Sequence, residues 1–284
     1  MKTFILDASV CNGCYCCQIA CKDEHVGNDW SPYAKPQPDT GQFWIKVNEV
    51  ERGSIPKVRV TYTPILCMHC EDAPCVDAAT NGAVYRRSDG LVIIDPVKSA
   101  GQKQLVESCP YGAIFWNDAL GIPQKCTGCA HILDGAGCVP SEYPIHVPRC
   151  VDSCPTGAIK FGEESDLKDL ISQAEVLHPK HEAKPRVHYL NLPKRFIAGE
   201  VFDAVVDECL DGATVTATDL MNGNVYTTQT DEFGDFWLEN LEVNCSYAVE
   251  IVRSGYVTRK IATVRTGADV NLGSIELKAT GLPG

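Results

Sequence analysis

The sequence contains no long apolar run and no excess of basic residues. No stretch approaches the roughly 18 apolar residues that suggest a membrane-spanning helix. The N-terminal residues MKTFILDASV lack a long hydrophobic region, a twin arginine and a small-residue cleavage site, so we expect no export signal. A formal net charge of −12 argues against a nucleic-acid partner, because such binding requires clustered Lys and Arg. We expect no membrane span and a cytoplasmic chain, with export alongside a signal-bearing partner as the alternative.

Cysteine is abundant. The 284 residues include 16 cysteines, and fourteen of them precede residue 155. They recur at spacings of two and three residues, whereas disulfide-stapled proteins are usually short and carry a signal peptide. Buried structural thiols do not produce repeated C-x-x-C spacing. The pattern therefore predicts metal binding.

The length and the cysteine distribution predict two domains joined by a linker. We expect a cysteine-rich ferredoxin-like domain over residues 1–162 and a linker over 163–195. Within the linker, Asp166 to Ala174 has the apolar spacing of a short helix, and the following basic, Pro-containing stretch is expected to be extended. Residues 196–284 form the second domain, so the predicted fold class is α+β.

The C-terminal domain has the two-residue period of half-buried strands. Phe236 and Leu238 alternate with Asp235, Trp237 and Glu239, and Tyr247 and Val249 alternate with Ala248 and Glu250. Asn222-Gly223 is a strong hairpin signal. We expect an antiparallel sandwich or barrel of about seven strands. The order of its segments resembles carboxypeptidase-regulatory-like and transthyretin-like domains, a resemblance of fold that implies no shared chemistry.

The cysteines fall into four segments. The first has the C-x2-C-x2-C-x3-C run of bacterial ferredoxins, except that Lys22 stands where proline is usual. CPYGAI and CPTGAI each resemble the last cysteine of a ferredoxin motif. Three thiolates on one tight loop reach three irons of a cubane, and a distant cysteine must serve the fourth. The segments contain Cys11, Cys14, Cys17 and Cys21; Cys67, Cys70 and Cys75; Cys109; and Cys126, Cys129, Cys150 and Cys154.

This order resembles the iron–sulfur subunits of molybdopterin enzymes of the dimethyl-sulfoxide-reductase family. That family holds four motifs, of which the first pairs with the fourth and the second with the third. Carried over to this chain, the resemblance implies three complete [4Fe-4S] ligand sets. These are Cys11, Cys14, Cys17 and Cys154 for the first cluster; Cys21, Cys126, Cys129 and Cys150 for the second; and Cys67, Cys70, Cys75 and Cys109 for the third.

The family pattern also implies a fourth cluster, whose ligands are all missing here. Its cysteines would stand at Ala79-Thr80 and around Ser99, Gln102 and Leu105. Because the loss removes one whole site and spares its neighbour, it supports the crossed pairing.

Zinc is an alternative for the C-x2-C pairs, but zinc ribbons have no reason to carry the ferredoxin run or the paired Cys-Pro ends. His69 and His131 flank ligand cysteines and could replace a thiolate as in Rieske centres. Since each cluster already has four cysteines, we expect both histidines near the clusters or at the surface.

Four cysteines are surplus. Cys16 is an alternative to Cys17 as the third ligand of the first motif, but only Cys17 gives the ferredoxin spacing. Cys138 lies in a segment longer than the family usually allows and could displace Cys150, which we favour because it precedes Cys154 by three residues. The remaining two are expected to be packed or half-exposed thiols, because a reducing cell disfavours a disulfide between them. These two are Cys209 and Cys245.

The sequence shows no phosphate-binding Gly-rich loop, no nucleophile elbow and no open metal site. Clusters saturated by thiolates move single electrons, so catalysis is expected on a partner. The missing cluster and the β-domain resemble the small subunits of transhydroxylases of the pyrogallol–phloroglucinol type and their relatives acting on phenols. This resemblance implies a large catalytic subunit, forming a heterodimer, that holds molybdopterin guanine dinucleotide with Mo or W.

Three functions stay open at this point. The chain could serve a transhydroxylase, in which no net electrons leave, or it could deliver electrons to a reductive dehydroxylase or another reductase of the family. It could also be a structural assembly module with non-redox clusters. We rank the structural function last, because it would need one cluster and not three.

Overall fold

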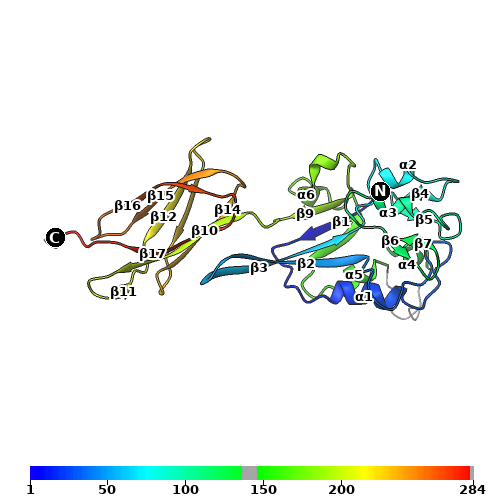
Figure 1. Cartoon of the computed structure of the whole chain (residues 1–284), viewed down its shortest axis with the longest axis horizontal. Coiled ribbons are helices and arrows are strands. Elements are labelled where there is room, and N and C mark those ends of the chain that lie inside the picture. The colour runs from blue at the N-terminus through cyan, green and yellow to red at the C-terminus, as the bar shows by residue number, and fades with distance from the viewer. Residues whose placement is uncertain (136–145, 282–284) are drawn as a thin grey trace. The chain divides into compact units, whose positions relative to one another are not determined.

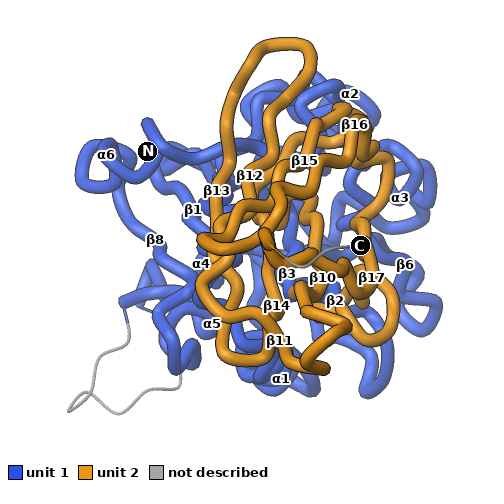
Figure 2. Tube along the Cα trace, turned by 90° about the vertical axis from the view of Figure 1, so that its left-hand side faces the viewer, with its two compact units in different colours: residues 1–49, 62–192 blue, residues 50–61, 193–284 orange. Residues whose placement is uncertain are grey.

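The computed structural model describes residues 1–135 and 146–281, which form two compact units (Figure 2). The first unit contains Met1–Glu49 and Tyr62–Leu192, and the second contains Val50–Thr61 and Pro193–Gly284. Most of the segment 163–195, which the sequence suggests as a linker, thus lies in the first unit. In the described residues no helix is long and apolar enough to cross a bilayer.

The first unit contains a three-stranded sheet in the order β8-β1-β9, of which β1 and β9 are labelled in Figure 1. Strand β1 (Lys2–Asp7) pairs antiparallel with β8 (Ile159–Glu163) and parallel with β9 (Val187–Leu190). The β9 pairing explains why the segment after residue 162 belongs to this unit. Two short hairpins complete its strands: β4 (Val84–Arg86) with β5 (Val92–Ile94), and β6 (Phe115–Asn117) with β7 (Ile122–Gln124).

The helices of the first unit are short, and several of them begin at or beside cysteines. The predicted helix Asp166–Ala174 forms only its central turn as α6, and the basic stretch after it contains a 3-10 turn, η1. The helical segments are α1 (Cys16–His25), α2 (Pro74–Asp77), α3 (Gln104–Glu107), α4 (Ala130–Leu133), α5 (Arg149–Asp152), α6 (Lys168–Ile171) and η1 (Pro179–His181).

Thiols are part of the hydrophobic core of the first unit. Trp44, Tyr189 and Phe4 are among its largest fully buried side chains. Seven cysteines belong to the same buried cluster, so thiols take places in this core that aliphatic side chains usually fill. They are Cys17, Cys21, Cys67, Cys70, Cys75, Cys126 and Cys150.

The second unit is a sandwich of two four-stranded sheets, which confirms the predicted β-domain and selects the sandwich over the barrel. The inward positions of β14 and β15, including Phe236, Leu238, Tyr247 and Val249, are buried as the alternation predicts. The two sheets contain eight strands, one more than the seven expected, because the two-residue strand β11 is counted as well. One sheet has β10 (Arg195–Asp203), β11 (Glu208–Cys209), β14 (Asp235–Leu241) and β17 (Val270–Glu276); the other has β12 (Thr214–Asp219), β13 (Val225–Gln229), β15 (Ser246–Val252) and β16 (Arg259–Arg265).

The hairpin signal at Asn222-Gly223 marks the turn between β12 and β13, which pair antiparallel. The connection is longer than two residues, because β12 ends at Asp219 and β13 begins at Val225. Gly223 has a φ of +76°, a backbone conformation that glycine adopts at little cost.

A long hairpin of β2 (Ile45–Ser54) and β3 (Lys57–Leu66) is shared between the units. Its tip, Val50–Thr61, belongs to the second unit. There the Arg52 guanidinium donates to both carboxylate oxygens of Asp269, at 2.9 and 2.7 Å, and both side chains are nearly buried. Lys57 pairs with Asp235. The sequence alone does not indicate these two ion pairs.

Candidate metal centres

The structure brings twelve cysteines together in three groups of four. The members of each group lie close together: repulsion from the other members contributes to a raised pKa of Cys11 and Cys17 in the first group, of Cys21 and Cys150 in the second and of Cys70 in the third. The groups coincide with the three predicted ligand sets, whose role as cluster ligands stays a prediction. The first thiol group is Cys11, Cys14, Cys17 and Cys154; the second is Cys21, Cys126, Cys129 and Cys150; and the third is Cys67, Cys70, Cys75 and Cys109.

Helix α1 explains why one ferredoxin run serves two groups. Cys17, Cys21 and His25 are its buried residues, and their spacing of four places them on one helical face. Four residues advance the helix by about 6 Å, so Cys21 lies one turn beyond Cys17. Cys21 therefore joins the second thiol group, while Cys17 stays with the first. Cys16 lies off this face and is exposed.

The two Cys-Pro segments form the same turn. The Ala113 N–H donates to the Cys109 sulfur at 3.4 Å. Around Cys154, burial raises the thiol pKa, but hydrogen bonds from the Thr156 side chain and from nearby backbone N–H groups outweigh it, and the pKa is lowered. Gly112 and Gly157, three residues after the cysteines, both have a positive φ. The turns thus direct backbone dipoles at the sulfur, as a thiolate ligand requires.

The third thiol group lines a small cavity. All four of its cysteines face this space, together with Met68, Tyr111 and Lys125. Pro74 occupies the first turn of α2, where its missing N–H costs no helical hydrogen bond, and it places Cys75 at the start of the helix. The His69 N–H donates to the Cys67 sulfur at 3.4 Å. Four thiols from two distant segments thus surround one enclosed space.

The protonation of these thiols tests their fit to a metal cluster. Burial, followed by repulsion from neighbouring cysteines, raises the pKa of Cys17 and of Cys70 to about 12. Burial also raises the pKa of Cys126 to about 11. Thiols in such positions are protonated at neutral pH unless a cation compensates the charge, and a coordinating metal deprotonates them outright. The donor sets therefore fit a cationic iron–sulfur core.

The described residues include no set of three or more His, Cys, Asp or Glu side chains that could hold a metal ion. A cubane differs from a one-ion site, because its thiolates bind separate irons rather than one shared point.

The positions of the missing fourth site also lie together. The Gln102 amide accepts a hydrogen bond from the Thr80 N–H at 2.9 Å and donates to the Thr80 carbonyl at 3.3 Å. Ser99 and Leu105 are fully buried. Packed and hydrogen-bonded side chains join the two segments that the family pattern would join through a cluster.

Both histidines singled out in the sequence are buried, at 1% exposure, and neither is a surface residue. His69 Nδ1 accepts the Val92 N–H at 3.0 Å, and burial lowers its pKa well below the ordinary value. His131 Nε2 lies 2.9 Å from the Glu24 carboxylate, and its ring stacks on Trp30.

The sequence analysis did not identify two further residues that lie near the thiols, His25 and Lys125. His25 Nε2 lies 4.0 Å from the Cys129 sulfur, and burial lowers the pKa of its ring to about 3. The four-residue step from Cys21 could have indicated it. Lys125 is buried beside the second and third thiol groups, and its only sequence signal is its place directly before Cys126.

Three of the surplus cysteines lie in the described part of the chain. Cys16 is exposed, and a hydrogen bond with Cys14 raises its pKa. Cys209 and Cys245 are free thiols in the second unit. Cys138 lies outside the described residues, so the choice of Cys150 as ligand remains a prediction.

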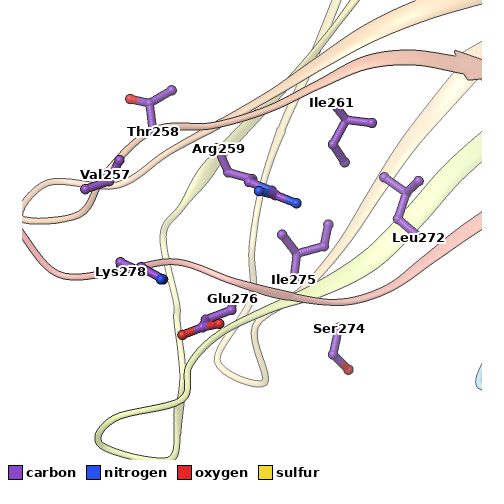
Figure 3. Close-up of a pocket in the computed structure, with 9 residues that line it drawn as sticks. All are labelled: Val257, Thr258, Arg259, Ile261, Leu272, Ser274, Ile275, Glu276 and Lys278. Atoms are coloured by element: carbon purple, nitrogen blue, oxygen red, sulfur yellow. The ribbon is translucent and has the colours of Figure 1, made fainter. Parts of the chain in front are cut away.

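The second unit contains a groove between β16 and β17, which are edge strands of the two sheets (Figure 3). Ile261 and Ile275 point toward each other between these strands. The polar residues around them include Arg259 and Glu276. Ser274, also in this lining, donates a hydrogen bond to the Glu200 carboxylate at 2.9 Å.

Comparisons with known proteins agree with this architecture. Residues 58–164 match a family described as 4Fe-4S dicluster domain, and residues 197–278 match the carboxypeptidase regulatory-like domain. The chain is 37% identical over 282 residues to the pyrogallol hydroxytransferase small subunit of Pelobacter acidigallici, an alignment that covers 96% of this chain and 98% of that protein.

Two other relatives match about two thirds of the chain. A sulfite dehydrogenase subunit of Allochromatium vinosum is 33% identical, over 67% of this chain and 82% of its own length. An anaerobic dimethyl sulfoxide reductase component of Escherichia coli is 31% identical, over 66% of this chain and 83% of its own length. The chain therefore belongs to the iron–sulfur electron-transfer subunits of the dimethyl-sulfoxide-reductase family of molybdopterin enzymes, the group that contains the pyrogallol hydroxytransferase small subunit.

Proposed function

We propose that the chain holds three [4Fe-4S] clusters, one in each thiol group, and passes single electrons along them to or from a large molybdopterin subunit. Each cluster would supply one-electron redox chemistry. The cysteines would fix the clusters in place, and the surrounding core would exclude water from the second thiol group, whose four cysteines are all buried.

The linear order of the thiol groups carries this proposal. Cys17 of the first group lies near Cys21 and Cys150 of the second. Cys126 of the second group lies near Cys67 of the third. The second group thus stands between the other two, as a relay between two ends requires. The exposed Cys14 and the partly exposed Cys109 place the outer groups nearer the surface.

The length of the match favours a phenolic substrate on the partner. The relative named for pyrogallol aligns with nearly the whole chain, including the β-domain, whereas the sulfite and dimethyl sulfoxide relatives align with about two thirds. We infer a heterodimer whose large subunit holds molybdopterin guanine dinucleotide with Mo or W and moves aromatic hydroxyl groups. The cytoplasm is the proposed compartment.

A reductive dehydroxylase is the second candidate, because the relatives that match about two thirds of the chain include reductases. The two candidates differ in electron balance. Turnover by a transhydroxylase consumes no net reductant, whereas a dehydroxylase consumes two electrons for each hydroxyl removed. Following phenol conversion in the purified complex against an electron donor of known concentration separates them.

Anaerobic co-purification tests the proposal. We expect about twelve irons and twelve acid-labile sulfides per chain, from three cubanes, together with a large subunit that contains Mo or W. The isolated chain should convert no phenol. Eight irons, stoichiometric zinc, or phenol turnover by the chain alone would refute the assignment.

A further inference from the structure

Lys125 is a lysine buried among the candidate cluster ligands. Its residue exposure is only 2%, although lysine is among the residues most rarely buried. The ammonium group donates to the Val92 carbonyl and, at 3.0 Å, to the Cys126 carbonyl. The Cys67 and Cys75 side chains also lie close enough to act on its charge. Two of the three ammonium donors thus have a backbone carbonyl as acceptor, which holds the side chain beside the third thiol group.

This position lies between two thiol groups. Lys125 lines the cavity of the third thiol group with all four of its cysteines. It also directly precedes Cys126, a member of the second thiol group, and bonds to that residue's carbonyl. Its charge therefore acts on two neighbouring sites at once. The first thiol group is absent from its contacts among the described residues.

Two other basic side chains near the third thiol group, His69 and Arg86, contribute less positive charge to it than Lys125 does. His69 is neutral in this arrangement, because its Nδ1 accepts the Val92 N–H at 3.0 Å and so has no proton. Arg86 donates to the Cys70 carbonyl at 2.7 Å, but it is only half-buried, and solvent screens its charge. Lys125 has no such screening.

We propose that Lys125 is a positioning residue that holds a fixed positive charge between the second and third sites and raises the reduction potential of the third cluster most. The inference rests on the proposed function. Reduction adds one negative charge to a cluster, and a nearby cation in a low-dielectric core stabilises that charge. Lys125 lines the cavity of the third thiol group with all four of its cysteines, whereas of the second group only Cys126 is bonded to its ammonium, so the potential of the second cluster rises less.

The three clusters therefore differ in reduction potential. An electron that enters the chain of clusters is held preferentially at the third site, while the first site keeps the potential set by its own surroundings. The burial of a charged lysine, which costs free energy unless the charge is paired, is consistent with such a role.

An EPR-monitored redox titration of the co-purified complex tests this inference. Lys125→Met removes the charge and all three donors at similar side-chain length. We expect the ratio of reduced to oxidised third cluster at a fixed potential to fall at least tenfold, which is a shift of about −59 mV for a one-electron couple. The second cluster should shift less and the first not at all. Lys125→Arg should restore most of the potential.

Lys22→Met is the matched control. Lys22 also adjoins a ligand position, Cys21, but its ammonium donates to the Pro38 and Gly41 carbonyls at 2.9 and 2.7 Å. Because its charge acts on Cys21, its replacement should affect the second cluster only and leave the potentials of the first and third clusters unchanged. The Cys109→Ser and Cys154→Ser complexes assign the signals of the third and first clusters.

An unchanged third potential in Lys125→Met with all twelve irons retained would overturn the inference, and so would equal shifts of the three clusters. If Lys125→Met loses iron, Lys125→Gln decides, since it removes the charge but keeps a donor. A lowered third potential in that variant supports the inference, and an unchanged one overturns it. Wild-type protein without clusters would refute the proposed function instead.

Discussion

Replacing Asp269 with alanine should release the tip of the β2–β3 hairpin from the second unit. The carboxylate accepts two hydrogen bonds from Arg52 and one from the Phe196 N–H at 3.1 Å. Asp269 is only 4% exposed and Arg52 10%. Removing one partner of such a buried pair leaves the other charge uncompensated and costs about 3–5 kcal/mol. We therefore expect the free energy of unfolding of the second unit to fall by that amount.

Urea unfolding of the full chain, followed by Trp237 fluorescence, measures this loss. Urea is preferred to guanidinium because added salt screens ion pairs. Glu239→Ala is the control, since the Arg59–Glu239 pair joins the same hairpin to the sandwich but is nearly half exposed on both sides. Exposed pairs contribute about 0–1 kcal/mol. Equal losses in the two variants, or a loss below about 1 kcal/mol in Asp269→Ala, would contradict the reasoning from burial.

Three further changes test the candidate metal centres. Cys109→Ala should open only the third cluster, leaving a three-iron centre visible by EPR, and damage to the other two clusters would contradict the pairing. Gly128→Ala should destabilise the chain by about 1–3 kcal/mol in urea unfolding, because Gly128 has a φ of +63° and an added Cβ would lie 2.8 Å from Leu91; an unchanged midpoint would contradict this. Cys16→Ser should retain about twelve irons, because Cys16 points away from the buried face of α1. Loss of iron would make Cys16 a ligand.

The sequence predicted the features that depend on regular spacing. Alternation indicated the buried face of β15. This prediction succeeded because periodicity is a local property, which the chain expresses before any long-range contact forms. The ligand sets came from the resemblance to the family, and they stay a prediction although the structure groups the same cysteines.

The features that the sequence did not indicate depend on contacts between distant residues. Nothing near Arg52 shows that its partner stands more than 200 positions away at Asp269. The contacts of Lys125 with Val92 and Cys67 likewise arise only when separate segments meet. A single charged residue has no periodic pattern, so its role becomes visible only in the folded chain.

The crossed pairing is the central claim, and the Cys154→Ala variant tests it most directly. Cys154 stands four positions after Cys150 in the chain, yet the structure places it with Cys11 and Cys17. EPR and iron analysis of the anaerobically purified complex should show a three-iron centre at the first site, with the second and third clusters intact. Opening of the cluster on Cys126 and Cys129 instead would contradict the pairing and require two of the three ligand sets to be redrawn.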